Sequence, residues 1–159
     1  MTINVRRIVT AHAPDGKAIV GTDKIMTNVQ QLRSGNYESL LWVTEETPAD
    51  VNGEDLTDTP RDIEPPATGS IFRILELVPG KEAYMHRTDT IDYAICLRGK
   101  CEMYLDDGDK ISFNEGDVMV QRATMHGWAN PFSEPCQIAF ILIGSNPPNK
   151  HWHEDAEKH

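Results

Sequence analysis

The sequence has few cysteines, and none is spaced in a way that indicates a disulfide framework or a zinc finger. Only three are present, Cys96, Cys101 and Cys136, and no two of them form a CxxC pair. An odd number without paired spacing argues against structural disulfides. Cys96 and Cys136 lie in apolar runs, so we expect them to be packed thiols rather than metal ligands.

Long apolar runs and an excess of positive charge are missing as well. No stretch approaches the roughly 20 apolar residues of a membrane-spanning helix, and the first residues contain no apolar core of a signal peptide. With 15 Lys and Arg against 25 Asp and Glu, the formal net charge is −10, which repels nucleic acid and anionic membranes. We therefore expect a cytoplasmic protein with neither a nucleic-acid nor a membrane partner.

Helical periodicity is scarce, and short apolar runs recur between turn signals instead. Pro14-Asp15-Gly16-Lys17 and Asp106-Asp107-Gly108 each predict a hairpin between two β-prone runs. The runs predict strands over residues 7–11, 18–22, 39–44, 71–77, 82–88, 92–97, 101–105, 110–113, 118–121, 126–130 and 137–143. Many short strands separated by turns are typical of an all-β sandwich or barrel.

The length fits one domain over residues 1–159. Residues 45–70 are rich in Pro, Asp, Glu, Thr and Gly, and we interpret them as a long surface excursion inside that domain. We expect residues 1–69 to supply N-terminal strands and this loop, packed on a core barrel over 70–144. A polar tail over 145–159, with His151 and His153, completes the prediction.

Strand alternation groups the polar side chains that carry chemistry. Three sets would each share one strand face: Glu82, Tyr84, His86 and Thr88; Asp92, Ala94 and Cys96; His126, Trp128 and Asn130. If these faces point inward, the polar groups converge inside an apolar barrel. Unpartnered polar burial costs roughly 2–7 kcal/mol, so we expect a metal ion or a hydrogen-bonded cluster there.

Two segments resemble the paired motifs of the cupin superfamily. The first motif reads G-x5-H-x-H-x3/4-E-x6-G, and the segment from Gly80 to Gly99 keeps every spacing around His86, with Thr88 in place of the second His and Asp92 in place of the Glu. The second motif reads G-x5-P-x-G-x2-H-x3-N. The stretch GDVMVQRATMHGWAN keeps its H-x3-N end, but it is one residue short before the His and lacks the Pro and the second Gly.

This resemblance implies a cupin-type jelly-roll β-barrel, or double-stranded β-helix. His86, Asp92 and His126 fall on its metal-ligand positions, whereas Thr88 is a poor ligand. Two His and one carboxylate suit iron first, then manganese, nickel or zinc. Because Asp is one methylene shorter than Glu, Asp92 could instead orient His86 without touching the metal.

The leading hypothesis is a metal-dependent enzyme acting on a small organic molecule, with oxygenase, decarboxylase and isomerase or lyase chemistry all open. The alternatives need no metal: an isomerase or lyase with His86 as base, Asp92 as its partner and Tyr84 as acid, or a small-molecule binder without catalysis. Four further residues are candidates for the pocket: Thr88, Trp128, Arg122 and Asn130. Of these, Arg122 could hold an anionic substrate at the pocket mouth.

Apolar residues occupy both parities of several strands, as in 71–77 and 137–143. Such strands are covered on both faces, and the barrel core covers only the inner one. We expect a second subunit to cover the outer face, which agrees with the dimers that many cupins form. The alternative is that the N-terminal segment supplies this cover.

Overall fold

The regular structure is almost entirely β. The computed structural model describes residues 3–149, and in this range it contains eleven strands and one three-residue 3-10 turn. The elements are β1 (Arg6–His12), β2 (Ala18–Ile25), β3 (Gln30–Gln31), β4 (Tyr37–Thr44), β5 (Ser70–Leu77), β6 (Thr90–Arg98), β7 (Lys100–Tyr104), η1 (Asp106–Gly108), β8 (Lys110–Asn114), β9 (Val118–Arg122), β10 (Gly127–Ala129) and β11 (Cys136–Gly144). The predicted all-β class is confirmed. Within residues 3–149, no helix is long and apolar enough to span a membrane.

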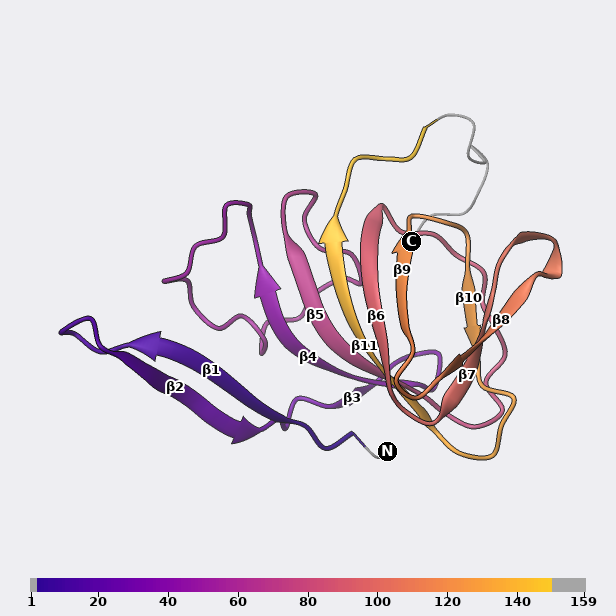
Figure 1. Cartoon of the computed structure of the whole chain (residues 1–159), viewed down its shortest axis with the longest axis horizontal. Coiled ribbons are helices and arrows are strands. Elements are labelled where there is room, and N and C mark those ends of the chain that lie inside the picture. Colours follow the sequence, from indigo (N-terminus) through magenta and orange to yellow (C-terminus); the bar gives the residue numbers. More distant parts are fainter. Residues whose placement is uncertain (1–2, 150–159) are drawn as a thin grey trace.

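Two antiparallel sheets curl around a common interior (Figure 1). One has six strands in the order β3-β4-β5-β11-β6-β9, and the other has three in the order β10-β7-β8. Along β6, the inward positions Thr90, Asp92, Ala94 and Cys96 are buried and alternate with exposed residues. The core between the sheets contains Leu77, Phe113, Trp128, Ile138 and Phe140, and all three cysteines are buried free thiols. The alternation predicted for residues 92–96 therefore holds.

Both predicted hairpins are confirmed. β1 pairs with β2 around the turn at residues 13–17, with a bulge between Val9 and Thr10. β7 pairs with β8 around η1, where Asp107 and Gly108 both have positive φ. The excursion over residues 45–69 contains no regular strand. The end of the predicted tail, including His151 and His153, lies outside the described residues.

The strand predicted over residues 82–88 is wrong. This segment forms no continuous strand, and isolated bridges join it to the barrel, among them Lys81 with Asn130 and His86 with His126. Between the bridges, the chain passes across Gly127, where an added Cβ would lie 3.0 Å from Met85 Sδ and from the carbonyl oxygen of Tyr84. The segment therefore crosses Gly127 in close contact and does not pair with it along a continuous β-ladder.

Gly99 joins β6 to β7 with a φ of +76°, and a Cβ there would lie 2.5 Å from the carbonyl oxygen of Pro135. Gly108 has nearly the same φ, +77°, but open space around it. We expect Gly99→Ala to lower the free energy of unfolding by about 2–4 kcal/mol, because a steric clash adds to the cost of a left-handed backbone. Gly108→Ala should cost only about 1–2 kcal/mol. Urea denaturation measures both, and equal losses would contradict this account.

Arg7 is buried at the base of the β1–β2 hairpin. Its guanidinium donates to the carbonyl oxygen of Leu41 at 2.8 Å and to both carboxylate oxygens of Asp55. Burial raises the pKa of Asp55, but hydrogen bonds from Arg7 and Thr57 and the positive charge of Arg7 outweigh it and lower the pKa to about 2. These contacts attach the hairpin to the excursion.

A pKa below that of the unfolded chain means that the ionised Asp55 stabilises the fold above about pH 4 and that this contribution is lost as the pH falls toward 2. We therefore expect Asp55→Asn to be less stable than the wild type at pH 7, with the difference shrinking between about pH 4 and pH 2. Thermal unfolding followed by circular dichroism tests this. Asp58→Asn, in an exposed position of the same segment, is the control; a difference independent of pH would refute the role of this ion pair.

Candidate functional site

A cavity of about 270 Å³ lies in the interior between the two sheets. Its apolar wall consists of Ile63, Leu75, Leu77, Trp128, Phe140 and Leu142, among others. Its polar wall includes Glu38, Arg73, Glu82, Tyr84, His86, Thr88, Asp92 and His126. The cavity therefore brings together the three predicted metal-ligand positions and the predicted acid, Tyr84, although the segment carrying His86 is not a strand.

His86 and His126 are neighbours because their backbones pair directly. Each N–H donates to the other residue's carbonyl oxygen, at 2.8 and 2.9 Å. The two imidazole rings then lie with centroids 4.4 Å apart and planes tilted by 60°. A single antiparallel bridge thus sets the spacing of the two side chains.

Both imidazoles are oriented through Nδ1. Nδ1 of His86 lies 3.0 Å from the carbonyl oxygen of Tyr84, and Nδ1 of His126 lies 2.9 Å from that of Thr124. A carbonyl oxygen can only accept, so each Nδ1 carries the proton, and the lone pair of the neutral ring is on Nε2. A histidine that ligates a metal through Nε2 is held in this way.

Asp92 is 4% exposed and belongs to a short chain of hydroxyl groups. Its Oδ1 accepts a 2.6 Å hydrogen bond from Oγ1 of Thr90, which lies 2.8 Å from Oγ1 of Thr88. Burial raises the pKa of Asp92 to about 6 against the hydrogen bond from Thr90 and the positive charge of Arg73, and the negative charge of Glu64 adds to the rise. Asp92 can therefore exchange a proton near neutral pH.

The donor atoms of the histidine pair fit a divalent transition metal, since both rings present Nε2 as the unprotonated nitrogen. No set of three His, Cys, Asp or Glu side chains within residues 3–149 is arranged to hold a metal ion. The structure therefore provides two imidazole donors, and the Asp92 carboxyl lines the same cavity but is bonded to Thr90. Because Nδ1 of His86 faces the carbonyl oxygen of Tyr84, Asp92 does not orient His86 through that nitrogen.

Gln121 is a polar residue that the sequence analysis did not select. It lies on β9 directly opposite Asp92 on β6, it is 4% exposed, and neither its Oε1 nor its Nε2 has a hydrogen-bond partner. A buried amide without a hydrogen-bond partner costs about 1–3 kcal/mol. The cross-strand register with Asp92 is the signal that identifies it.

A buried ion pair was missed as well. Arg73 on β5 donates to Glu38 on β4 at 2.8 Å, and both side chains are about nine-tenths buried, with exposures of 10% and 11%. Arg73 also donates to the carbonyl oxygen of Ile63 at 2.8 Å. It therefore holds the excursion against the cavity, where Ile63 forms part of the wall.

The remaining predicted residues occupy different environments. Tyr84 is 58% exposed, and its ring is stacked 6.0 Å from that of His86. Trp128 is buried in the cavity wall. Arg122 is exposed and does not line the cavity, and neither does Asn130, which is fully buried and donates to the carbonyl oxygens of Leu77 and Glu134. Asn130 thus connects the loop after β10 to the end of β5.

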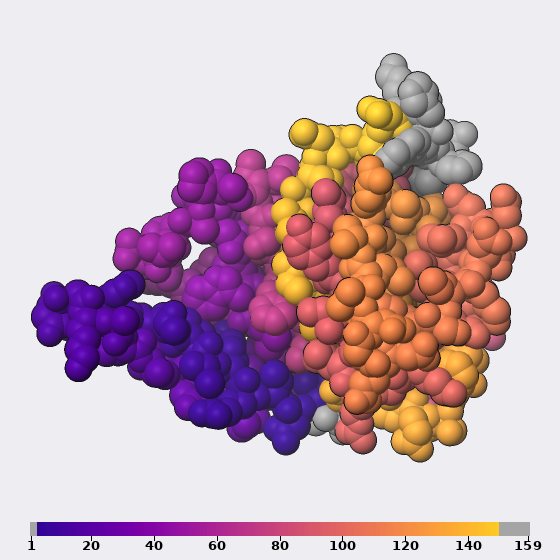
Figure 2. All heavy atoms as spheres, in the orientation of Figure 1, coloured from indigo at the N-terminus to yellow at the C-terminus, as the bar shows by residue number. Residues whose placement is uncertain are grey.

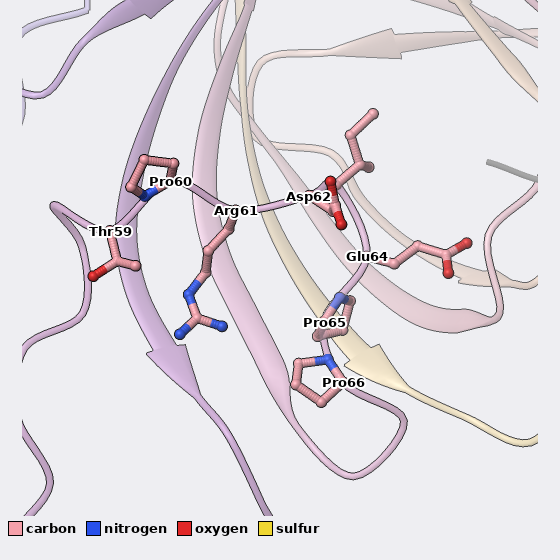
Figure 3. A pocket seen from close by; sticks show the side chains of 8 residues that line it. Thr59, Pro60, Arg61, Asp62, Glu64, Pro65 and Pro66 are labelled. Atoms are coloured by element: carbon pink, nitrogen blue, oxygen red, sulfur yellow. The ribbon is translucent and has the colours of Figure 1, made fainter.

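A larger hollow, of about 950 Å³, lies along residues 59–66 of the excursion (Figure 3). One chain segment lines it, Arg61 and Glu64 extend from this segment in different directions, and it contains no histidine or cysteine. Because His86, Asp92 and His126 converge in the smaller cavity, we take the smaller cavity as the candidate site.

No protein-family model matches the sequence, but individual proteins do. The chain is 31% identical over 153 residues to the cupin-domain-containing oxidoreductase virC of Hypocrea virens, covering 89% of this chain and 76% of the relative. This chain belongs to the cupin superfamily. It is also 44% identical over 111 residues to the cupin-domain-containing oxidoreductase srdD of Neurospora crassa, covering 66% of this chain and only 57% of that protein.

The chain is also similar to one further relative and to one solved structure. A phomopsin biosynthesis cluster protein of Diaporthe leptostromiformis is 35% identical over 150 residues, which cover 89% of this chain and 79% of the relative. An RmlC-like cupin from Shewanella frigidimarina superposes with a TM-score of 0.51 at 13% identity over 76% of this chain and 86% of that one. The predicted jelly-roll cupin barrel is thereby confirmed.

The unsatisfied amide of Gln121 leads to a stability prediction. We expect Gln121→Leu to raise the free energy of unfolding of the ligand-free protein by about 1–2 kcal/mol, because an unpartnered polar group is removed from the interior. Gln137→Leu is the matched control: its Nε2 donates to the buried Glu76 at 2.8 Å, so its loss should cost about 1–3 kcal/mol. Urea titrations give both values, and a destabilised Gln121→Leu would show that Gln121 is satisfied in the folded chain.

Proposed function

We propose that this cupin is an enzyme that acts on a small organic molecule in the cavity, with a divalent transition metal held by His86 and His126. The observation that carries the proposal is the matched orientation of the two rings, each of which has its Nδ1 against a backbone carbonyl oxygen and Nε2 as donor atom. Iron is the first candidate, followed by manganese, nickel and zinc. Such an ion, when bound, acts as a Lewis acid or activates oxygen.

The relatives support an oxidoreductase reaction. Two of them, at 44% and 31% identity, are named cupin-domain-containing oxidoreductases, and the 35% relative is named for a biosynthesis cluster. We infer for this chain an oxidoreductase role on a biosynthetic small molecule, with oxygenase chemistry favoured among the reactions left open by the sequence.

The apolar and the polar residues of the cavity have different roles in this proposal. Leu75, Phe140 and Leu142 line it with apolar surface that excludes water from a hydrocarbon or ring. Its volume of about 270 Å³ suits a small molecule rather than a polymer. At the polar wall, Asp92 can hold or give up a proton at its carboxyl near neutral pH.

The metal-free alternative uses His86 as base and Tyr84 as acid. The stacking of the two rings favours it. In this reading, Asp92 would not orient His86 through Nδ1, because that nitrogen faces the carbonyl oxygen of Tyr84 and Oδ1 of Asp92 accepts from Thr90. A binder without catalysis is the third candidate, supported by the apolar cavity alone.

Metal content separates these candidates. In full-length protein without an affinity tag, with His151 and His153 replaced by Ala to remove adventitious ligands, we expect about one transition metal per chain by mass spectrometry after anaerobic iron loading. His86→Ala and His126→Ala should each abolish this binding, because one imidazole alone is a weak site. His12→Ala, in an exposed position of β1, is the control.

Metal retained in both site variants, or absent from the parent protein after loading, would overturn the metal proposal. In the second case, the acid–base reading predicts that a substrate found by screening is turned over without metal and that Tyr84→Phe abolishes turnover. The binder reading predicts binding without turnover.

A further inference from the structure

One lysine, Lys81, lines the cavity. It is half-buried and lies after the end of β5, where its backbone pairs with Asn130. Its Nζ donates to the carbonyl oxygen of Ser34 at 2.7 Å, and no carboxylate within residues 3–149 forms an ion pair with it. Because an ammonium group has three N–H donors, two of them remain available to a ligand.

The other basic side chain of the cavity wall is already neutralised. Arg73 forms an ion pair with Glu38, whose second oxygen accepts from Gln30 at 2.8 Å. This buried pair therefore brings no net charge to the cavity. Arg122, which the sequence analysis selected for an anionic substrate, does not line it. In the part of the chain that the structure describes, Lys81 is thus the cationic Lys or Arg of the wall without a carboxylate partner.

The two remaining carboxyl groups of the wall do not compensate this charge. Asp92 is in register with Ile71 through β11, six residues before Leu77 at the end of β5. At the rise of an extended strand, this places Asp92 about 20 Å along the sheet from the end near Lys81. Glu82 is exposed, so water and salt screen its charge.

Two uncharged groups lie beside Lys81 in the cavity wall, Ser34 and Asn36. Oγ of Ser34 accepts from the backbone N–H of Asn36 at 3.4 Å, so its hydroxyl proton is available to a ligand. Asn36 is 7% exposed, and its Oδ1 accepts from the backbone N–H of Val78 at 3.2 Å. Its Nδ2 has no acceptor among the described residues. The Lys81 cluster, which is Lys81 with Ser34 and Asn36, therefore offers donors to an oxygen anion.

The Lys81 cluster and the histidine pair lie at different places in the same cavity. The segment from Lys81 to His86 connects them, and its ends pair with Asn130 and His126. Four residues separate these two partners, which corresponds to about 13 Å of extended chain. A small molecule that contacts the cluster with one end can therefore place its other end toward the imidazoles, along the apolar wall.

We propose that the substrate is a small apolar carboxylic acid, bound as its carboxylate by Lys81, Ser34 and Asn36. The proposal rests on the proposed function, which makes this cavity the substrate site. A single ammonium group matches the single charge of a carboxylate, and charge-assisted hydrogen bonds are stronger than neutral ones. A ligand with a neutral or cationic group at this position would leave Lys81 without a counter-charge, so the cluster also determines specificity.

Equilibrium binding to full-length protein freed of metal by chelation tests the proposal. The probes are phenylalkanoates with one to four methylene groups, with the primary carboxamide and the primary ammonium compound of each length, titrated by ligand-observed NMR. We expect at least one carboxylate to bind about tenfold or more tightly than its amide, and the ammonium compound to bind more weakly still. In Lys81→Met the ratio of carboxylate to amide affinity should fall to about one, whereas Lys81→Arg should keep a preference for the carboxylate.

Lys24→Met is the matched control. Lys24 is exposed on β2, in the hairpin that extends away from the rest of the molecule (Figure 2), so its loss should leave the ratio unchanged. No carboxylate preference in any length, a preference that survives Lys81→Met, or tighter binding of the ammonium compound would each overturn the proposal. Because the binding assay contains no metal, its outcome is independent of the metal assay for the histidine pair. Circular dichroism checks folding, and Lys81→Gln replaces a Lys81→Met variant that does not fold.

Discussion

The paired backbone hydrogen bonds between His86 and His126 are the constraint on which the site depends. The segment over residues 81–88 joins the barrel through isolated bridges, and one of them is this pair. The same pairing brings the two rings within 4.4 Å of each other. Gly127 makes it possible, because any larger residue would push Met85 and Tyr84 away. The geometry of the site is therefore set where two irregular segments pass close to each other, and not by a regular strand.

The two departures from the cupin motif act together in this framework. At the position of the second motif histidine, Thr88 joins Thr90 in a line of hydroxyls that ends on Oδ1 of Asp92. A carboxylate one methylene shorter than Glu is thus tied to the wall of the cavity instead of reaching across it. The hydroxyls and the short carboxyl form one hydrogen-bonded unit. The two imidazoles supply the stronger donor atoms for a metal ion.

The sequence predicted these features unequally, for physical reasons. Alternation identified β6 correctly because one of its faces is buried and the other is exposed. The same rule misassigned residues 82–88, where polar residues recur at every second position without a ladder, yet His86 was still placed in the cavity because motif spacing does not depend on local conformation. The sequence analysis did not select Gln121 or the Arg73–Glu38 pair. Their cross-strand neighbours are set by strand register, which a single sequence does not reveal.

The outer face of the six-stranded sheet shows the same limit. Apolar residues of both parities required a cover, but only the structure divides it between Ile3 and Met26 on one half and open surface on the other. Arg7 fixes the base of the β1–β2 hairpin through Leu41 and Asp55, so one buried guanidinium attaches the hairpin both to β4 and to the excursion.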